Sequence, residues 1–345
     1  MKLSAVDLSP VPEGGTATEA YAQTVDAARQ AERLGFERFW VAEHHGMGSR
    51  LAGVAPEVLL GHLAAETESI RLGSGAVLLN HYSPFKVAEQ FGVLDGLAPG
   101  RVDAGLGRAN GSPAVDRALG TSRRVRNPDE DHRQKITAVV NHLYDDYPEG
   151  HEYADVEIPR SGADEPIPWV LGSSASSAKI AGQLGLRFCF AAFIRPQFAV
   201  PAFEAYRETF EPSSLAGGID EPQGMVALNA VAAESDHEAA RRRAVAEATF
   251  QRMQRGEVGS TPSVEEAIDE LCGVPEPTPA TLDEDEWPRA ISGSPETIAG
   301  LFEQLADRVG VDELMIQHAV PDHERALRSH ELLAEGVGSR TERGW

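Results

Sequence analysis

Cysteine, lysine and long apolar runs are all scarce in this sequence. Its 345 residues contain two cysteines, Cys189 and Cys272, in unrelated settings, which excludes a disulfide framework and favours a reducing compartment. No run approaches the roughly 20 apolar residues of a transmembrane helix. The N-terminal stretch MKLSAVDLSP is soon interrupted by Asp7 and Pro10, so it does not resemble a signal peptide. We therefore expect a cytoplasmic protein with no membrane partner.

Positive charge is scarce as well. Asp and Glu number 54 against 31 Lys and Arg, which gives a formal net charge of -23, and only four of the cations are lysines. Such a surface repels nucleic acid phosphates and anionic membranes, so a nucleic acid partner is excluded. An acidic, lysine-poor composition is typical of a halophilic protein. An ordinary acidic cytosolic enzyme is the alternative.

Short apolar runs alternate with stretches of helical periodicity along the chain, which predicts an α/β fold. Helices are predicted at 17–35, ending at a Gly35 C-cap, and at 83–100. Eight near-continuously apolar strands predict a closed (β/α)8 TIM barrel in one domain, 1–345. An open doubly wound sheet is the alternative, but the first strand–helix turn carries no GxGxxG. The predicted strands are 3–9, 38–43, 70–79, 101–107, 168–173, 187–193, 224–233 and 313–319.

Three segments depart from this alternation. Residues 145–167 are polar and turn-rich, which predicts a surface loop that could hold a small hairpin. Residues 256–294, rich in proline and acid, form an insertion between the seventh and eighth strands. They are either a lid over one rim or a solvated loop. Residues 336–345 are expected to be a tail.

The carboxyl ends of barrel strands are where an active site is expected. After the fifth strand, GSSASSA (172–178) leads directly into a helix, and a helix N-terminus with serine hydroxyls suits a phosphate. The candidate donors are Ser173, Ser174 and Ser177. The alternative is that one serine is an ordinary N-cap of the helix and the others have no role in binding a ligand. Arg108, after the fourth strand, could supply the counter-charge on the same rim.

The stretch WVAEHHG places Glu43, His44 and His45 after the second strand. Successive side chains of a strand face opposite sides, so Glu43 and His45 would point one way and His44 the other. Three consecutive residues are poorly placed to bind one tetrahedral metal ion. The remaining interpretations are a buried structural histidine, or a rim histidine that assists a cofactor or substrate by proton transfer.

Several of these segments, in this order and spacing, resemble the luciferase-like flavin monooxygenases, closest to the stand-alone oxidoreductases of that superfamily. The resemblance runs from the first strand to about residue 193 and resumes at 292–317. The segments that carry it are AERLGFERFWVAEHHG (31–46), IRLGSGAVLL (70–79), SPFKVAEQFGVLDGLAPGRVDAGLGRANG (83–111) and VLGSSASSAKIAGQLGL (170–186).

The resemblance implies FMN bound at the C-terminal rim and electrons passed from reduced flavin to O2. Arg108 and the serines at 173, 174 and 177 would hold the flavin phosphate. The ring would lie against the third strand at Ser74 and Gly75, where the family often has a strained non-proline peptide bond. His44 would assist the flavin chemistry.

The resemblance also implies the partners of the reaction. A separate flavin reductase is expected, because no nicotinamide-binding fingerprint is present. The other expected partners are O2, a small organic substrate and a second copy of the chain, in a homodimer through the early helices.

Three alternatives stay open at this stage. A deazaflavin in place of FMN would make the protein a hydride-transferring dehydrogenase or reductase. A flavin-binding protein without turnover, and a barrel hydrolase or lyase acting on a phosphorylated substrate, are the others. Light emission is not expected, because Gly107 stands where bacterial luciferase has a reactive cysteine.

Overall fold

The computed structural model describes residues 1–120, 125–162, 164–257, 261–284, 286–318, 320 and 322–341. Eight parallel strands form a closed barrel, because β10 pairs with both β1 and β8. The predicted TIM barrel is therefore confirmed and the open sheet is wrong. The eight strands are β1 (Lys2–Asp7), β2 (Arg38–Val41), β3 (Arg71–Ser74), β5 (Val102–Gly107), β6 (Ile167–Gly172), β7 (Arg187–Ala191), β8 (Gly224–Ala232) and β10 (Glu313–Gln317).

Two short strands were not predicted as separate elements. The predicted strand 70–79 is divided, because a cis peptide bond joins Gly75 and Ala76 between β3 and β4 (Val77–Leu78). This bond lies one residue beyond the position expected from the resemblance. The second strand, β9 (Ala290–Gly293), pairs with the last four residues of β8. The insertion 256–294 thus ends in a strand and is not simply a loop.

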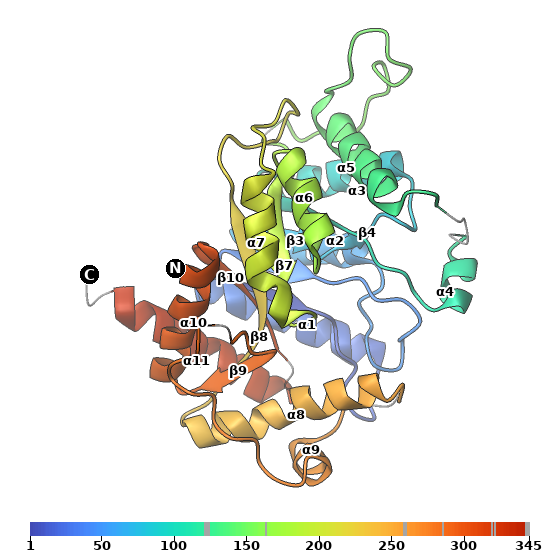
Figure 1. The fold of residues 1–345 in the computed structure, drawn as a ribbon. Helices are drawn as coiled ribbons and strands as arrows, with labels where there is room; N and C mark the ends of the chain where they lie inside the picture. Colours follow the sequence, from blue (N-terminus) through green and yellow to red (C-terminus); the bar gives the residue numbers. More distant parts are fainter. Residues whose placement is uncertain are drawn as a thin grey trace.

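Helices surround the barrel, and α6 and α7 lie side by side outside β7 (Figure 1). The predicted helix 17–35 is confirmed, because it ends before Gly35, whose φ is +76°. The predicted tail is helical as far as Thr341, and residues 342–345 lie outside the described part, as does residue 319 of the predicted eighth strand. The helices are α1 (Ala17–Arg33), α2 (Pro56–Glu66), α3 (Pro84–Leu97), α4 (Pro113–Ala118), α5 (Pro128–Tyr144), α6 (Ala175–Gln183), α7 (Ala199–Glu208), α8 (Asp236–Gln254), α9 (Val264–Glu270), α10 (Pro295–Val309) and α11 (His323–Thr341).

The barrel interior is filled by side chains that alternate with outward-facing ones along the strands. Trp40 and Trp169 meet edge to face inside it, with ring centroids 5.9 Å apart. Outside, the helices cover a larger apolar core, and at one end α8 and α9 pack together beyond β8 and β9 (Figure 1). The barrel is therefore a packed scaffold, and any ligand must bind at an end of it.

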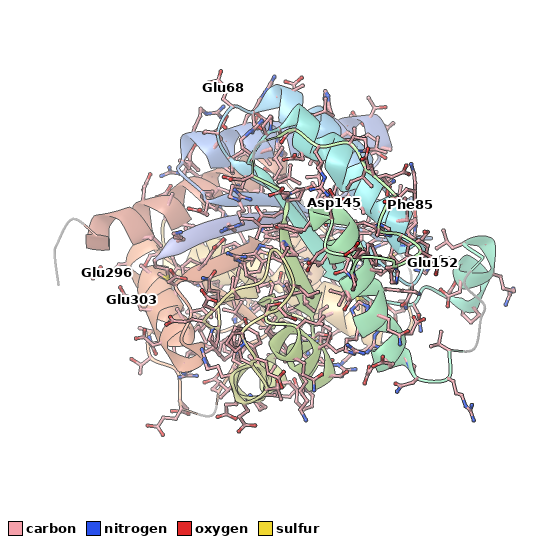
Figure 2. All side chains as sticks on the ribbon, turned by 90° about the horizontal axis from the view of Figure 1, so that it is seen from above. Glu68, Phe85, Asp145, Glu152, Glu296 and Glu303 are labelled. Carbon is pink, nitrogen blue, oxygen red and sulfur yellow. The ribbon has the colours of Figure 1, made fainter. Side chains whose placement is uncertain are left out.

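The predicted surface loop 145–167 has no regular strand or hairpin in its described residues up to 166, and its last residue, Ile167, begins β6. It lies near Phe85 of α3 in the view down onto the molecule (Figure 2). His142 of α5 joins them: its ring lies 5.0 Å from that of Phe85 and 4.8 Å from that of Tyr147. Acidic side chains such as Glu68 and Glu296 are exposed at the edge of the same view (Figure 2), as the net charge requires.

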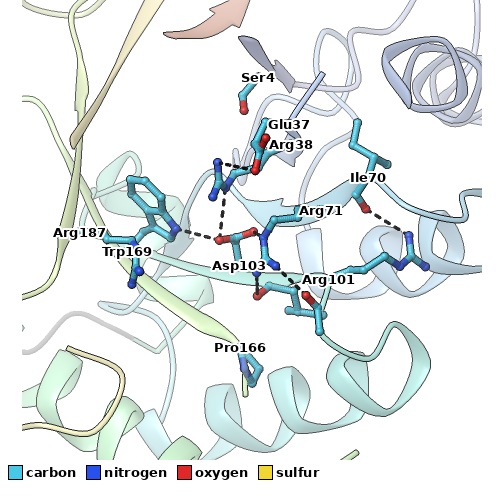
Figure 3. Close-up of polar contacts among 12 residues, drawn as sticks. Ser4, Glu37, Arg38, Ile70, Arg71, Arg101, Asp103, Pro166, Trp169 and Arg187 are labelled. Atoms are coloured by element: carbon cyan, nitrogen blue, oxygen red, sulfur yellow. Dashed lines mark hydrogen bonds and ion pairs between the residues drawn. The ribbon is translucent and has the colours of Figure 1, made fainter. Parts of the chain in front are cut away.

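The N-terminal end of the barrel is closed by a buried ion cluster around Asp103 (Figure 3). Its carboxylate accepts a hydrogen bond of 2.7 Å from Arg71 Nε and one of 2.9 Å from Trp169 Nε1, and lies 3.5 Å from Arg38 Nε. Arg38 also pairs with Glu313. Burial alone would lower the pKa of the Arg38 guanidinium, but the carboxylates of Asp103 and Glu313 raise it. Polar residues at this end of such a barrel serve stability.

Candidate active site

The predicted site residues lie at the carboxyl ends of the parallel strands, on one rim of the barrel. His44 follows β2, Ser74 ends β3, Arg108 follows β5 and Ser173 follows β6. Ser74 is fully buried, and its hydroxyl both donates to the carbonyl of Gly105 and accepts from its N–H, at 2.7 and 3.0 Å. The Ser74 hydroxyl therefore ties β3 to β5, and contact with a ligand is left to the backbone that follows.

Glu43 and His45 pair with each other, while His44 turns to a cavity. The Glu43 carboxylate lies 2.5 Å from His45 Nε2 and accepts hydrogen bonds from the Leu78 N–H at 2.8 Å and the Tyr82 hydroxyl at 2.7 Å. Burial raises the pKa of Tyr82, and Glu43 raises it further, so Tyr82 remains a donor. Strand alternation thus predicted correctly that Glu43 and His45 point one way and His44 the other. The hydrogen bonds of Glu43 hold in place the turn that carries His44.

His44 has the properties of a neutral proton acceptor or donor. Its main-chain N–H donates to the carbonyl of Gly53 at 2.8 Å, and its Nδ1 is buried without a hydrogen-bond partner among the described residues. Burial lowers the pKa of His44, and the neighbouring His45 lowers it further. The imidazole is therefore uncharged near neutral pH.

The serines predicted to hold a phosphate lie at the N-terminus of α6. Ser174 is its N-cap: the hydroxyl accepts from the Ser177 N–H at 3.3 Å, and the two hydroxyl oxygens lie 3.2 Å apart. A Cβ on Gly172 would overlap the Ser177 side chain, so glycine is required there. The serine turn thus leaves room for a ligand only on its outer side, where Ser173 is partly exposed.

Arg108 reaches this turn through a residue that the sequence did not single out. Its Nη2 lies 2.6 Å from Asp129 Oδ1, on the first turn of α5, while its Nη1 is buried with no partner in the described chain. Hydrogen bonds from Ser176 and from Arg108 lower the pKa of Asp129. Ser176 lies inside the GSSASSA motif and could have been proposed, whereas nothing in the pattern of α5 indicated Asp129.

We expect Arg108→Gln to weaken FMN binding about 10- to 100-fold, because charge-assisted hydrogen bonds to phosphate contribute about 1.5–3 kcal/mol. Riboflavin lacks the phosphate, so its affinity should not change. Quenching of flavin fluorescence on titration measures both ligands. Asp129→Asn is the control: it removes a negative charge from the same place and should tighten FMN binding. An equal loss for FMN and riboflavin would contradict a phosphate role for Arg108.

His132 of α5 lies behind Arg108. Burial, together with the positive charges of Arg108 and Lys135, lowers the pKa of His132 to about 4. The folded protein thus binds this proton less readily than the unfolded chain, whose histidines titrate near 6.5. The stability that follows is present above pH 6.5 and is lost as the pH falls toward 4.

We expect His132→Phe to remove up to about 3 kcal/mol of the acid-dependent loss of stability, at about 1.4 kcal/mol per pKa unit. Urea unfolding at pH 7 and pH 4.5 measures it. His62→Phe, at a histidine whose side chain is 56% exposed, is the matched control and should keep the wild-type slope. Equal slopes in all three proteins would show that His132 does not titrate in this range.

A cavity of about 1150 Å³ opens at the same rim, between β1, β2, β8, β10, α8 and α11. His44, Asn229 and Gln317 line it, whereas Arg108 and the serine turn do not. The insertion contributes Thr261, Ser263, Val264, Glu265, Pro288 and Arg289 to its wall. The segment considered as a lid therefore forms one side of this cavity.

Gly107 lies where a larger side chain would be crowded. A Cβ at Gly107 would lie 2.8 Å from the Cβ of Ala76, just after the cis peptide bond.

In the described part of the chain, no group of three or more His, Cys, Asp or Glu side chains could hold a metal ion. No helix among the described residues is long and apolar enough to cross a membrane.

Comparison with known proteins decides the family. The family model described as luciferase-like monooxygenase matches residues 1–313. The chain belongs to this family. It is 36% identical over 331 residues to a luciferase-like monooxygenase of Escherichia coli, with 95% of each chain covered. It is 34% identical over 338 residues to N-acetyl-S-alkylcysteine monooxygenase of Bacillus subtilis, with 98% of each covered.

Solved structures agree on the fold. Apo-MsnO8 superposes with a TM-score of 0.84 at 38% identity, covering 98% of both chains. More distant barrels include an oxygenating constituent of 3,6-diketocamphane monooxygenase in complex with FMN and an F420-dependent secondary alcohol dehydrogenase, with TM-scores of 0.71 and 0.65. At 20% and 16% identity, these two distant structures support the barrel fold alone. Membership of the luciferase-like monooxygenase family identifies the chain as an enzyme, and the hydrolase or lyase alternative no longer stands.

Proposed function

We propose that this luciferase-like monooxygenase uses reduced FMN, supplied by a separate flavin reductase, and O2 to oxygenate a small organic substrate. The observation that carries the proposal is the anion cradle at the rim. The Nη1 atom of Arg108 is buried without a partner in the described chain. Arg108 also contacts Asp129, and Asp129 accepts a second hydrogen bond from Ser176 at the N-terminus of α6. A phosphate would satisfy that nitrogen and the helix amides together.

The phosphate would be held by Arg108, Ser173, Ser174 and Ser177. Asp129 would have to give up its contact with Arg108, because two anions cannot share one guanidinium at low cost. The ring would lie along the backbone at Ser74 and Gly75, beside the cavity that His44 lines. The residues present therefore fit a flavin mononucleotide.

His44 is proposed as the residue that moves a proton at the reacting centre. The reduced flavin, when bound, supplies the electrons with which one atom of O2 enters the substrate and the other leaves as water. His44 would accept or donate a proton through its imidazole ring, which lines the cavity and whose buried Nδ1 has no competing partner among the described residues. The cavity wall formed by residues of 256–294 would exclude water from that centre.

A homodimer through the early helices is also proposed. Val58 of α2 and Val93 and Leu97 of α3 are 71%, 50% and 57% exposed, and the two helices are in contact. Apolar side chains gathered on neighbouring helices favour a partner surface. Light scattering measures the oligomeric state directly.

We further propose a cytoplasmic location, supported by the free thiols of Cys189 and Cys272. We also propose a source that tolerates high salt, supported by the acidic composition.

The proposed reaction is tested by isotope transfer. Protein, FMN, a flavin reductase, NADH, catalase and ¹⁸O₂ are incubated with three compound classes suggested by relatives: thioethers, cyclic ketones and terpene alkenes. We expect one ¹⁸O atom in a product of one class, dependent on both protein and FMN. FMN binding without label transfer to any class would favour the deazaflavin or non-catalytic alternative.

A further inference from the structure

Arg289 lies in the wall of the cavity and is held there by contacts with two other parts of the chain, α8 and the segment that follows β7. Its guanidinium lies 3.6 Å from the ring centroid of Phe250 on α8. Its Nη1 donates to the carbonyl oxygens of Phe193 and Ile194, just after β7, at 2.7 and 2.9 Å. A long side chain fixed by stacking and by two hydrogen bonds has already lost most of its conformational entropy before a ligand arrives.

This arginine has no anionic partner in the described chain. No described carboxylate lies within 4.0 Å of its guanidinium, and none of the described residues accepts a hydrogen bond from its Nε or Nη2. Arg243, which lines the same cavity, instead pairs with Glu247 at 3.3 Å. Burial lowers the pKa of Arg289 and no neighbouring acid offsets it. In a chain of net charge -23, a fixed and unpaired cation facing a cavity indicates that its counter-ion is a ligand.

The cavity around Arg289 is largely apolar. Its lining includes the apolar side chains of Phe193, Phe250, Met253, Val264, Leu51 and Val320. At about 1150 Å³ it exceeds what an inorganic anion needs. Neutral polar groups, Asn229 Oδ1 and Gln317 Oε1, lie elsewhere in its wall and lack described partners. Among the charged residues of this wall, Arg289 combines a position fixed by stacking and hydrogen bonds with the lack of a described acidic partner, and it lies beside an extended apolar surface.

We propose that the substrate is an organic anion, a carboxylate or sulfonate with an apolar body, whose charged end binds Arg289. The inference rests on the proposed function in that it takes this cavity as the substrate site. The free Nε and Nη2 face of the guanidinium can donate two hydrogen bonds to a carboxylate or sulfonate. Oxidation of the apolar body at the reacting centre would then leave the charged end unchanged.

The test uses three probes with one apolar body: 4-phenylbutanoate, 4-phenylbutane-1-sulfonate and 4-phenylbutanamide. Calorimetric titration of the FMN-loaded protein, and of the protein without flavin, should give at least one anion that binds about tenfold tighter than the amide. Arg289→Gln should abolish that difference, and Arg289→Lys should retain part of it. Tighter binding of only one anion would identify which head group the site accepts.

Arg50→Gln is the matched control, because Arg50 lines the same cavity and lacks a described carboxylate partner but is not stacked on a ring. It should keep the anion preference. Circular dichroism and thermal melting establish that each variant is folded. If Arg289→Gln does not fold, Arg289→Lys provides the test, because its ammonium group can still donate hydrogen bonds to the carbonyl oxygens of Phe193 and Ile194.

The proposal would be overturned by an amide that binds as tightly as the anions, by no binding of any probe, or by loss of the preference in Arg50→Gln and not at position 289. FMN affinity is measured in parallel by fluorescence. If FMN does not bind, the proposed function fails, while the anion preference is still decided by the calorimetry. If Arg289→Gln weakens FMN and not the probes, Arg289 serves the cofactor and the proposal is wrong.

Discussion

Replacing Asp103 with alanine will lower the free energy of unfolding by about 3–5 kcal/mol, because it leaves the buried Arg38 and the partly buried Arg71 without their shared carboxylate. Asp103 has no exposed surface and contacts the guanidinium groups of Arg38 and Arg71 and the indole N–H of Trp169 (Figure 3). In the folded variant the guanidinium groups would still be removed from water but would no longer have the carboxylate that compensates for this cost. The native state is therefore destabilised relative to the unfolded chain.

Denaturant unfolding of the purified variant measures this effect. The control is Glu89→Ala, which removes the acid of the exposed Lys86–Glu89 pair at 3.1 Å and should cost less than about 1 kcal/mol. FMN affinity should stay unchanged in folded Asp103→Ala, because the cluster lies at the opposite end of the barrel from the proposed site. A cost below about 1 kcal/mol for Asp103→Ala would show that this end of the barrel does not depend on the cluster.

Replacing His44 with alanine will reduce turnover by about 10²–10⁴-fold, the range that a positioned acid or base contributes. FMN affinity should change little, since His44 lines the cavity and the phosphate donors lie outside it. The readout is the rate of ¹⁸O transfer into the substrate that the isotope experiment identifies. Because burial lowers the pKa of His44, wild-type turnover should persist below pH 6.5 and decline only at more acidic pH.

His45→Ala separates the two histidines. His45 pairs with Glu43 and does not line the cavity, so we expect a fall in turnover of less than about tenfold, through a looser brace for the turn. If His45→Ala loses as much activity as His44→Ala, proton transfer cannot be assigned to His44 alone, because either substitution in this turn has the same effect. If His44→Ala remains fully active, His44 is a structural residue.

Much of the fold could be predicted because parallel barrel strands are buried on both faces and are therefore apolar throughout. The strand β9 was missed because AISG is short and contains a single β-branched residue, Ile291, beside three small or polar residues that give no strand signal. Its existence depends on β8, which extends beyond the barrel and offers Asn229–Ala232 as a pairing edge. That is a tertiary effect, and no local pattern contains it.

The candidate site divides in the same way. Strand alternation predicted that His44 would part from Glu43 and His45, because it depends only on backbone geometry. The contacts of Arg108 with Asp129, and of Asp129 with Ser176, depend on where α5 meets α6 in space. Ser74 was proposed for the cofactor, but the sequence could not show that its hydroxyl would be used by Gly105 of the neighbouring strand.

The central claim is that this luciferase-like monooxygenase works with reduced FMN, and anaerobic titration tests it most directly. The purified protein is titrated with reduced FMN and with reduced F420 in the same buffer, at low and at molar salt. We predict that reduced FMN binds at least tenfold tighter than the deazaflavin and that Arg108→Gln weakens it. Tighter binding of the deazaflavin would contradict the claim and assign the enzyme to oxygen-independent hydride transfer on the same barrel.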